Sequence, residues 1–441
     1  MRRFAAPISL SLLAAFTTLT SFTAITSLTL SGCSSNAPGK SSNFPSSTSS
    51  TSDASTSGAS SSTDSGFGAS GSAPIATIYS GATKFLTAKD IQALDKTAKI
   101  TPDTDDADWS ELTAKLSDGS EIKLNHESSN AKALDANIED LRRTITATIK
   151  DQMTTVAFDL ILITNKTKHT VTLTSTEPFS AAGNAFISSI AQKENAIVLH
   201  DNIVSDYTGK NLLADKASNQ DLPYFPSARK RKEASDAILK SKGIPVANFL
   251  APIEGEEEIV TRTPQETAQR LLALWVVALK ADGAKQPLLD KLLKGGNVQA
   301  YLTPKEAKFV ATKAPTKDDT AAYSWYIENI QTLLYALGQE KELPLSKEQC
   351  NSGEVAEKVV KLIGSDNGKT FVKQAKLRSN SEILNAKDLT LRAHWATEEA
   401  TSNKQPQPKN TNHEVLLERH KTLNWLTKYN DEDWDDVTAD T

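Results

Sequence analysis

The stretch "TPQETAQRLLALWVVALK", residues 263–280, contains both a helix start and a buried helix face. Thr263-Pro264-Gln265-Glu266 has the form of a capping box with proline at the first helical position. Five apolar residues then recur at helical spacing: Ala268, Leu272, Trp275, Val276 and Leu279. The stretch therefore predicts a helix that packs in a hydrophobic core.

The same signals continue to the C-terminus and predict a mostly α-helical domain over residues 221–441. Thr303-Pro304-Lys305-Glu306 and Ser379-Asn380-Ser381-Glu382 are two further capping boxes. A second apolar stripe, which Gly338 ends, consists of Tyr326, Ile330, Leu333, Leu334 and Leu337. Five of the six tryptophans also lie here, and the segment is long enough to bury a core of its own.

Residues 75–220 combine strand and helix patterns and predict an α+β domain. "ELTAKLSDGSEIKLNH" (111–126) alternates on both sides of Asp118-Gly119, which indicates a hairpin. We expect helices over 134–149 and through Phe186 and Ile190. We expect strands at "VAFDLILIT" (156–164), "HTVTLTST" (169–176) and "NAIVLHD" (195–201). The fold class is thus α+β, a sheet-plus-helix domain followed by a mostly helical one.

The first 33 residues have the form of an export signal. Arg2 and Arg3 precede an uncharged segment that runs to Leu30, and Leu30-Ser31-Gly32-Cys33 follows. These four residues resemble the lipobox of bacterial lipoproteins, which implies cleavage after residue 32 and acylation of Cys33, with palmitate among the chains. Two acyl chains hold a protein stably on a membrane. An uncleaved transmembrane helix is the alternative, and the high Ser/Thr content argues against it.

Residues 33–74 follow the signal and consist almost entirely of Ser, Thr, Gly, Ala and Asn after Cys33. Such a composition has nothing to bury and predicts a disordered tether. Because Cys33 is lipidated in this interpretation, Cys350 has no partner for an intramolecular disulfide, and we expect it in a loop. The net charge of −5 argues against a nucleic-acid partner.

Motifs for catalysis or cofactor binding are missing from the chain. Neither Gly-x-Ser-x-Gly, His-Glu-x-x-His nor Cys-x-x-Cys occurs. We therefore expect no cofactor and assign no metal ligands. His126, His169 and His200 stand singly in strand patterns, where surface or packing roles are expected. A lipid-anchored, extracytoplasmic binding module with a protein partner in the cell envelope is the favoured hypothesis.

Six blocks of the helical segment resemble the family known as domain of unknown function 4272, in order from Ala228 to Thr441. They include "RTPQETAQRLLAL", "YSWYIENIQTLLYALG", "LRAHW", "ERHKTLNW" and "DWDDVTADT". The resemblance implies a mostly helical bacterial domain without an established activity. This chain departs from the family pattern at Leu250-Ala251-Pro252, where a Leu-Pro pair is expected. It also carries the polar insertion "ATSNKQPQPKNTNHE" (400–414).

The last two predicted helices place charges inside apolar stripes. Arg419 falls among Leu416, Leu423 and Leu426, and Asp388 falls in the stripe of the preceding helix. An unpaired arginine in a core costs several kcal/mol. We therefore expect a structural clamp in which Arg419 meets Asp388, or in which the terminal acids fold back to the arginines. The expected anchors and acids of that tail are Trp434, Val437, Asp433, Asp435, Asp436 and Asp440.

The competing hypothesis is a hydrolase-like or metal-dependent enzyme whose cleft is closed by the tail. His394 or His420 would then be a general base, or histidines and aspartates would hold a divalent metal. A third hypothesis is a purely structural envelope component. Asp431, Asp433 and Asp435 resemble a calcium loop, but Asp436 occupies the position that needs glycine. The candidate cluster comprises Asp388, Arg392, His394, Glu418, Arg419, His420, Trp434, Asp435, Asp436 and Asp440.

Overall fold

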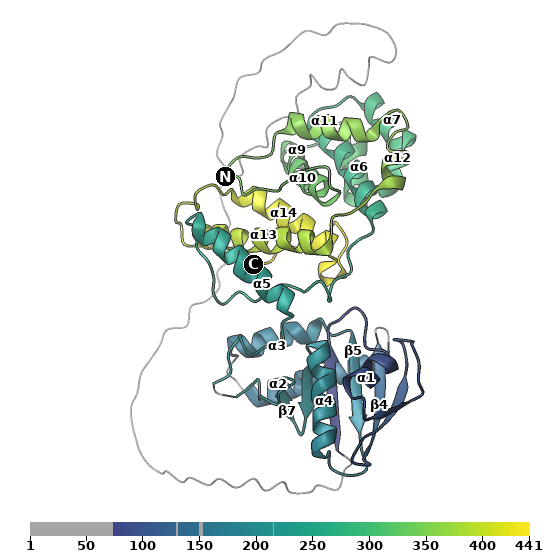
Figure 1. Ribbon diagram of the computed structural model, residues 1–441. Coiled ribbons are helices and arrows are strands. Elements are labelled where there is room, and N and C mark those ends of the chain that lie inside the picture. Colours follow the sequence, from purple (N-terminus) through teal and green to yellow (C-terminus); the bar gives the residue numbers. More distant parts are fainter. Residues whose placement is uncertain (1–73, 129–130, 150–152, 215) are drawn as a thin grey trace, which may run out of the picture. The chain divides into compact units, whose positions relative to one another are not determined.

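A computed structural model describes residues 74–128, 131–149, 153–214 and 216–441 (Figure 1). The predicted signal, Cys33 and all of the predicted tether except its last residue lie outside these ranges. All described residues belong to one compact unit. Within these ranges no helix has the length and apolarity needed to cross a membrane.

The N-terminal described region is built on a seven-stranded antiparallel sheet with the strand order β2-β3-β4-β5-β1-β6-β7. The strands are β1 (Ile75–Ser80), β2 (Lys99–Thr101), β3 (Glu111–Lys115), β4 (Glu121–Ser128), β5 (His169–Thr174), β6 (Ile197–His200) and β7 (Ile203–Ser205). Successive residues of β1 point to opposite faces, so Ile78 enters one core and Tyr79 the other.

Helices cover both faces of this sheet. They are α1 (Ala88–Leu94), α2 (Lys132–Ile149), α3 (Thr155–Asn165) and α4 (Ala181–Glu194). Ile91 of α1 and Phe186 of α4 share one core with Ile78. Leu141 of α2 and Leu160 of α3 share the other core with Tyr79. The predicted α+β class is confirmed, with one hydrophobic core on each side of the sheet.

Residues 156–164 are helical, so the strand predicted there is wrong. The side chain of Thr154 accepts a hydrogen bond from the backbone N–H of Ala157 and caps α3. Val156, Ala157 and Leu160 then lie on one face of α3 and enter a core. The hairpin prediction is confirmed, because β3 pairs with β4 around Gly119, whose φ is +86°.

The C-terminal described region is helical. Its elements are α5 (Pro226–Ser241), α6 (Pro264–Ala281), α7 (Gln286–Gly295), η2 (Val298–Tyr301), α8 (Pro304–Ala311), α9 (Lys317–Ser324), α10 (Tyr326–Ala336), α11 (Ser352–Ile363), α12 (Lys369–Gln374), α13 (Asn380–Ser402), α14 (His413–Leu426) and η3 (Tyr429–Asp431). Helix α6 is buried all round from Leu271 to Leu279 and contacts α7, α8, α9, α10 and α12. It is the central helix of the group that these five helices form with it (Figure 1).

The predicted capping boxes form at Thr263, Thr303 and Ser379, where α6, α8 and α13 begin. Helix α10 ends before Gly338, whose φ is +70°. Helix α13 packs against α5 and α14, and α14 packs in turn against α10 (Figure 1). These contacts bring the charged residues of α10, α13 and α14 into the interior of the region.

Candidate functional site

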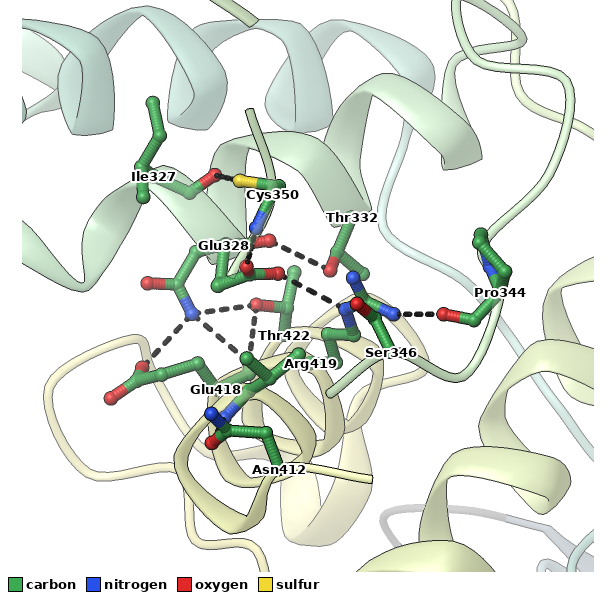
Figure 2. A network of polar contacts seen from close by, with 12 residues as sticks. Ile327, Glu328, Thr332, Pro344, Ser346, Cys350, Asn412, Glu418, Arg419 and Thr422 are labelled. Atoms are coloured by element: carbon green, nitrogen blue, oxygen red, sulfur yellow. Dashed lines mark hydrogen bonds and ion pairs between the residues drawn. The ribbon is translucent and has the colours of Figure 1, made fainter. Parts of the chain in front are cut away.

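Arg419 lies in the interior between α14 and α10 (Figure 2). Its side chain is 4% exposed, and its Nε donates to Oε2 of Glu328 at 3.1 Å. Its Nη1 donates to the carbonyl oxygen of Pro344 at 2.6 Å. The prediction that a guanidinium among leucines has an internal counter-ion is confirmed. The predicted partners are wrong, because Glu328 takes the place of Asp388 and the terminal acids.

Glu328 was missed at the sequence level, although its position carries a signal. It follows Ile327 and precedes Ile330 on α10, and it is fully buried. An acid within an apolar stripe needs a cation for the same reason that a buried arginine needs an anion. Glu328 also accepts the backbone N–H of Cys350 through Oε1. The carboxylate thus joins α10, α14 and the loop before α11.

Two more residues complete this network. Asn329 Nδ2 donates to the carbonyl oxygen of Glu418 at 3.0 Å and to Oγ1 of Thr422 at 2.9 Å. Cys350 is a half-buried free thiol in a loop, as predicted, and its Sγ lies 3.6 Å from the carbonyl oxygen of Ile327. Burial and the neighbouring Glu328 raise the pKa of this thiol, so it is a packing residue and a weak nucleophile.

Asp388 and Arg392 form a second buried pair, on α13. Arg392 donates to both carboxylate oxygens of Asp388 at 2.9 Å, and the two side chains are 2% and 0% exposed. Arg392 Nη2 also donates to the carbonyl oxygen of Ala251 at 2.9 Å. The loop that departs from the family pattern is therefore held through its main chain. A changed side chain at Ala251 leaves this contact intact.

The C-terminal tail is anchored by Trp434 and Val437, which are buried as predicted. The Trp434 ring packs edge-on against Trp425 and Tyr326, and the guanidinium of Arg270 lies 5.1 Å from its centre. These contacts fix the tail over α6, α10 and α14.

The terminal acids do not reach Arg392 or Arg419, so that part of the prediction is wrong. Asp435 accepts from Oγ1 of Thr303 at 2.9 Å, and Asp433 lies 3.8 Å from Arg262. Asp436 and Asp440 are exposed. Burial explains the outcome, since Arg392 and Arg419 already have partners in the interior. The acids instead face the start of α8 and the loop before α6.

A histidine group lies between α13 and α14. Nδ1 of His394 is 3.1 Å from Nδ1 of His420, and the two residues are 1% and 2% exposed. Burial, with a smaller contribution from His413, lowers the pKa of His394 to about 4. Burial and His394 lower the pKa of His420 well below its ordinary value. Both rings are therefore neutral at pH 7.

Glu398 and His413 belong to the same group and were missed at the sequence level. Oε1 of Glu398 lies 3.9 Å from Nε2 of His394 and 3.4 Å from Nε2 of His413. The available signal was the spacing of His394 and Glu398, which are four residues apart and face alike on a helix. The contacts of His413 with α13 depend on how the two helices pack, which no local sequence pattern shows.

The predicted cluster thus separates into groups with different partners. Arg392 contacts Asp388, Arg419 contacts Glu328, and His394 contacts His420. A groove of about 730 Å³, lined by residues of α11, α12 and adjoining loops, contains none of the predicted cluster residues. The two arginines serve packing. Of the three groups, the histidine group is the one in which ring nitrogens and a carboxylate converge.

The C-terminal region is thus a helical domain that contains buried ion pairs and this histidine group. The model of the family described as "Domain of unknown function (DUF4272)" matches residues 231–437. The resemblance predicted for the C-terminal half is thereby confirmed. No curated protein and no solved structure matches the chain.

Proposed function

We propose that the protein is a lipid-anchored, extracytoplasmic bacterial binding module. Its helical domain holds a ligand without transforming it, and Cys33 carries the lipid. The sequence pattern Leu30-Ser31-Gly32-Cys33 and the Ser/Thr-rich segment behind it support the anchor.

The internal pairing of the charged motif residues carries the preference for binding over catalysis. Asp388 and Arg392 neutralise each other, and so do Glu328 and Arg419, with side chains at most 4% exposed. A catalytic arginine or aspartate has to touch a substrate, and breaking one of these buried pairs costs about 3–5 kcal/mol. The four residues of these pairs therefore stabilise the fold.

Fractionation of cells that express the full chain tests the anchor. The wild-type protein is expected in the membrane fraction and open to added protease once the outermost barrier is permeabilised. Cys33→Ala is expected to abolish acylation and to keep the uncleaved precursor at the export membrane. Acylation of the Cys33→Ala variant, or protection of the folded region from protease, would overturn the anchor.

Turnover assays test the choice between binding and catalysis. Purified protein is incubated with chromogenic ester, phosphate ester and peptide substrates, and no hydrolysis is expected. Hydrolysis that Arg419→Lys abolishes, while circular dichroism shows a retained fold, would overturn the binding module.

A metal-dependent hydrolase is the second candidate, and one observation favours it. His394 and His420, the two histidines that this candidate uses, lie side by side, with their Nδ1 atoms 3.1 Å apart. A hydrolytic metal also needs an open coordination position for water. Metal-dependent turnover of any of the three substrate classes is the result that would place this candidate first.

A further inference from the structure

Three donor groups from α13 and α14 converge at one edge of the helical domain. One ring nitrogen each of His394 and His413 and a carboxylate oxygen of Glu398 all lie within 4.8 Å of one another. In a tetrahedral zinc site with bonds of about 2.0–2.1 Å, the ligand atoms stand roughly 3.3 Å apart. The distances of 3.4 and 3.9 Å from Glu398 Oε1 to the two Nε2 atoms are close to that spacing.

Local structure places all three groups. His394 and Glu398 are separated by one helical turn on α13, so both point from the same face. His413 is the first residue of α14, and the preceding Asn412 caps this helix through Val415 N–H. The ring centres of His394 and His413 are 5.2 Å apart. The ligand atoms, which lie within 4.8 Å of one another, would have to approach to about 3.3 Å to bind one ion.

A hydrogen bond at Nδ1 of His413 selects the tautomer in which Nε2 of the same ring has a lone pair. Thr397 Oγ1 donates to the carbonyl oxygen of His394 at 2.7 Å, so its remaining capacity is to accept. Nδ1 of His413 lies 3.3 Å from this oxygen and is therefore the donor. In the neutral ring, Nε2, which faces Glu398, then carries no hydrogen.

His394 has a matching arrangement. Its Nδ1 lies 3.1 Å from Nδ1 of His420, and in the tautomer in which His394 donates this hydrogen its Nε2 has a lone pair. Its Nε2 is buried and has no hydrogen-bond partner within the described part of the chain. A buried polar atom without a partner costs about 1–3 kcal/mol. An ion bound to Nε2 would remove this cost. Metal-ligating histidines commonly use their second nitrogen in such an orienting hydrogen bond.

We propose that His394, Glu398 and His413 bind one divalent transition-metal ion, with zinc as the best-fitting ion. Two imidazoles and a carboxylate suit the borderline ions of the first transition row, and zinc takes them in tetrahedral geometry. Glu398 and His413 side chains are 41% and 21% exposed, which gives the ion a path from solvent and a water as fourth ligand. The ion is the ligand of the binding module proposed above, so this step rests on that function.

His420 is a positioning residue in this site. It touches His394 through Nδ1 and holds the ring in the orientation that presents Nε2 to Glu398. Loss of such an outer partner lowers metal affinity by about 10- to 100-fold. His420→Asn is therefore expected to weaken zinc affinity while the three ligands remain.

Zinc titration of the purified full chain tests the site. The protein is stripped with a chelator, and binding of zinc alone is followed by calorimetry. Cobalt(II) substitution supplies a visible spectrum that distinguishes tetrahedral coordination. Wild-type protein is expected to bind one equivalent. Glu398→Gln and His413→Ala are each expected to weaken binding by more than the roughly 10- to 100-fold that loss of an outer partner costs, since the first neutralises a direct ligand and the second removes one.

His200→Ala is the matched control. His200 Nε2 lies 3.4 Å from the carboxylate of Asp201, so it forms a partly exposed histidine–acid pair outside the site. Zinc affinity is expected to be unchanged in this variant. Glu398→Gln and His413→Ala alter partly exposed side chains, and circular dichroism checks that they fold.

Unchanged zinc affinity in both ligand variants, or equal loss in His200→Ala, would overturn the site. Cells that express the same variants are fractionated, so that membrane retention is measured separately from zinc binding. A failed titration with normal membrane retention refutes the metal site alone. Acylation of Cys33→Ala, with normal zinc binding by the wild-type chain, refutes the anchor alone.

Discussion

Arg419 shows which part of a buried charge can be inferred from the sequence. Its place among Leu416, Leu423 and Leu426 requires burial, and burial requires a counter-ion. Both statements are local and both are confirmed. The identity of the counter-ion is not local, because Glu328 is 91 residues away along the chain. The choice between Asp388 and Glu328 depends on whether α14 turns this face to α13 or to α10.

Arg419→Ala is expected to lower the free energy of unfolding by about 3–5 kcal/mol, because Glu328 is left as an uncompensated buried charge. Denaturant unfolding followed by circular dichroism measures the change. Lys361→Ala is the control, since its ion pair with Glu357 is 72% and 57% exposed, and the expected cost is below about 0.5 kcal/mol. Equal midpoints for Arg419→Ala and the wild type would contradict the structural role.

Helix boundaries were predictable because their signals lie within one turn of chain. The three capping boxes identify the starts of α6, α8 and α13 without knowledge of any neighbour. Helix α3 was mistaken for a strand because a short apolar run with β-branched residues fits both structures. The deciding residue is Thr154, whose cap lies just outside that run. The site shared by α13 and α14 depends on packing, so only His394 and His420 were anticipated.

Thr263→Ala tests the start of the central helix. The Thr263 hydroxyl accepts from Glu266 N–H at 3.1 Å, and the Glu266 carboxylate accepts the Thr263 N–H at 2.7 Å. Loss of the cap is expected to cost about 1 kcal/mol, measured by thermal unfolding. Thr263→Ser keeps the hydroxyl and should remain close to the wild type. An equal loss in both variants would assign the effect to the lost methyl group.

Trp434→Ala tests whether the tail is part of the helical core. The ring is 2% exposed, and its removal leaves Trp425, Tyr326 and Arg270 facing a cavity. The expected cost is about 3–5 kcal/mol in denaturant unfolding, together with faster proteolysis of the last residues. Asp436→Ala, an exposed neighbour, should change stability by less than about 0.5 kcal/mol. A tail that is cleaved no faster in Trp434→Ala would contradict the anchoring role.

At the scale of the whole molecule, the order of α+β and helical segments follows from local patterns, whereas the strand order does not. β1 is the first strand in sequence but lies between β5 and β6. It pairs Ile75 with Thr174 and Ala76 with His200, which are 99 and 124 positions apart along the chain. Local alternation sets which side chains of a strand share a face, but long-range pairing decides the neighbour. Long-range packing also buries titratable groups that no local sequence pattern identifies as buried.

Two buried groups of the sheet region, Glu194 and His169, change the stability with pH in opposite directions. Burial raises the pKa of Glu194 to about 7, although the hydrogen bond from Ser80 opposes the shift. Its stabilising contribution is complete below pH 4.5 and is lost as the pH rises through 7. Burial and His126 lower the pKa of His169 to about 4, so its contribution is complete above pH 6.5 and is lost as the pH falls through 4.

Glu194→Gln is expected to remove the first slope. The amide oxygen can still accept from Ser80 Oγ, and the uncharged side chain resembles the protonated acid of the folded state. The variant should match the wild type near pH 4. By pH 8 it should be more stable by about 3 kcal/mol, because a pKa raised from 4.5 to about 7 corresponds to that difference. Chemical denaturation across this pH range measures the effect. Because the variant lacks the opposing contribution of Glu194, its stability should rise from pH 4.5 to 6.5 more steeply than that of the wild type. Parallel profiles for the two proteins would show that Glu194 is already ionised in the folded state near neutral pH.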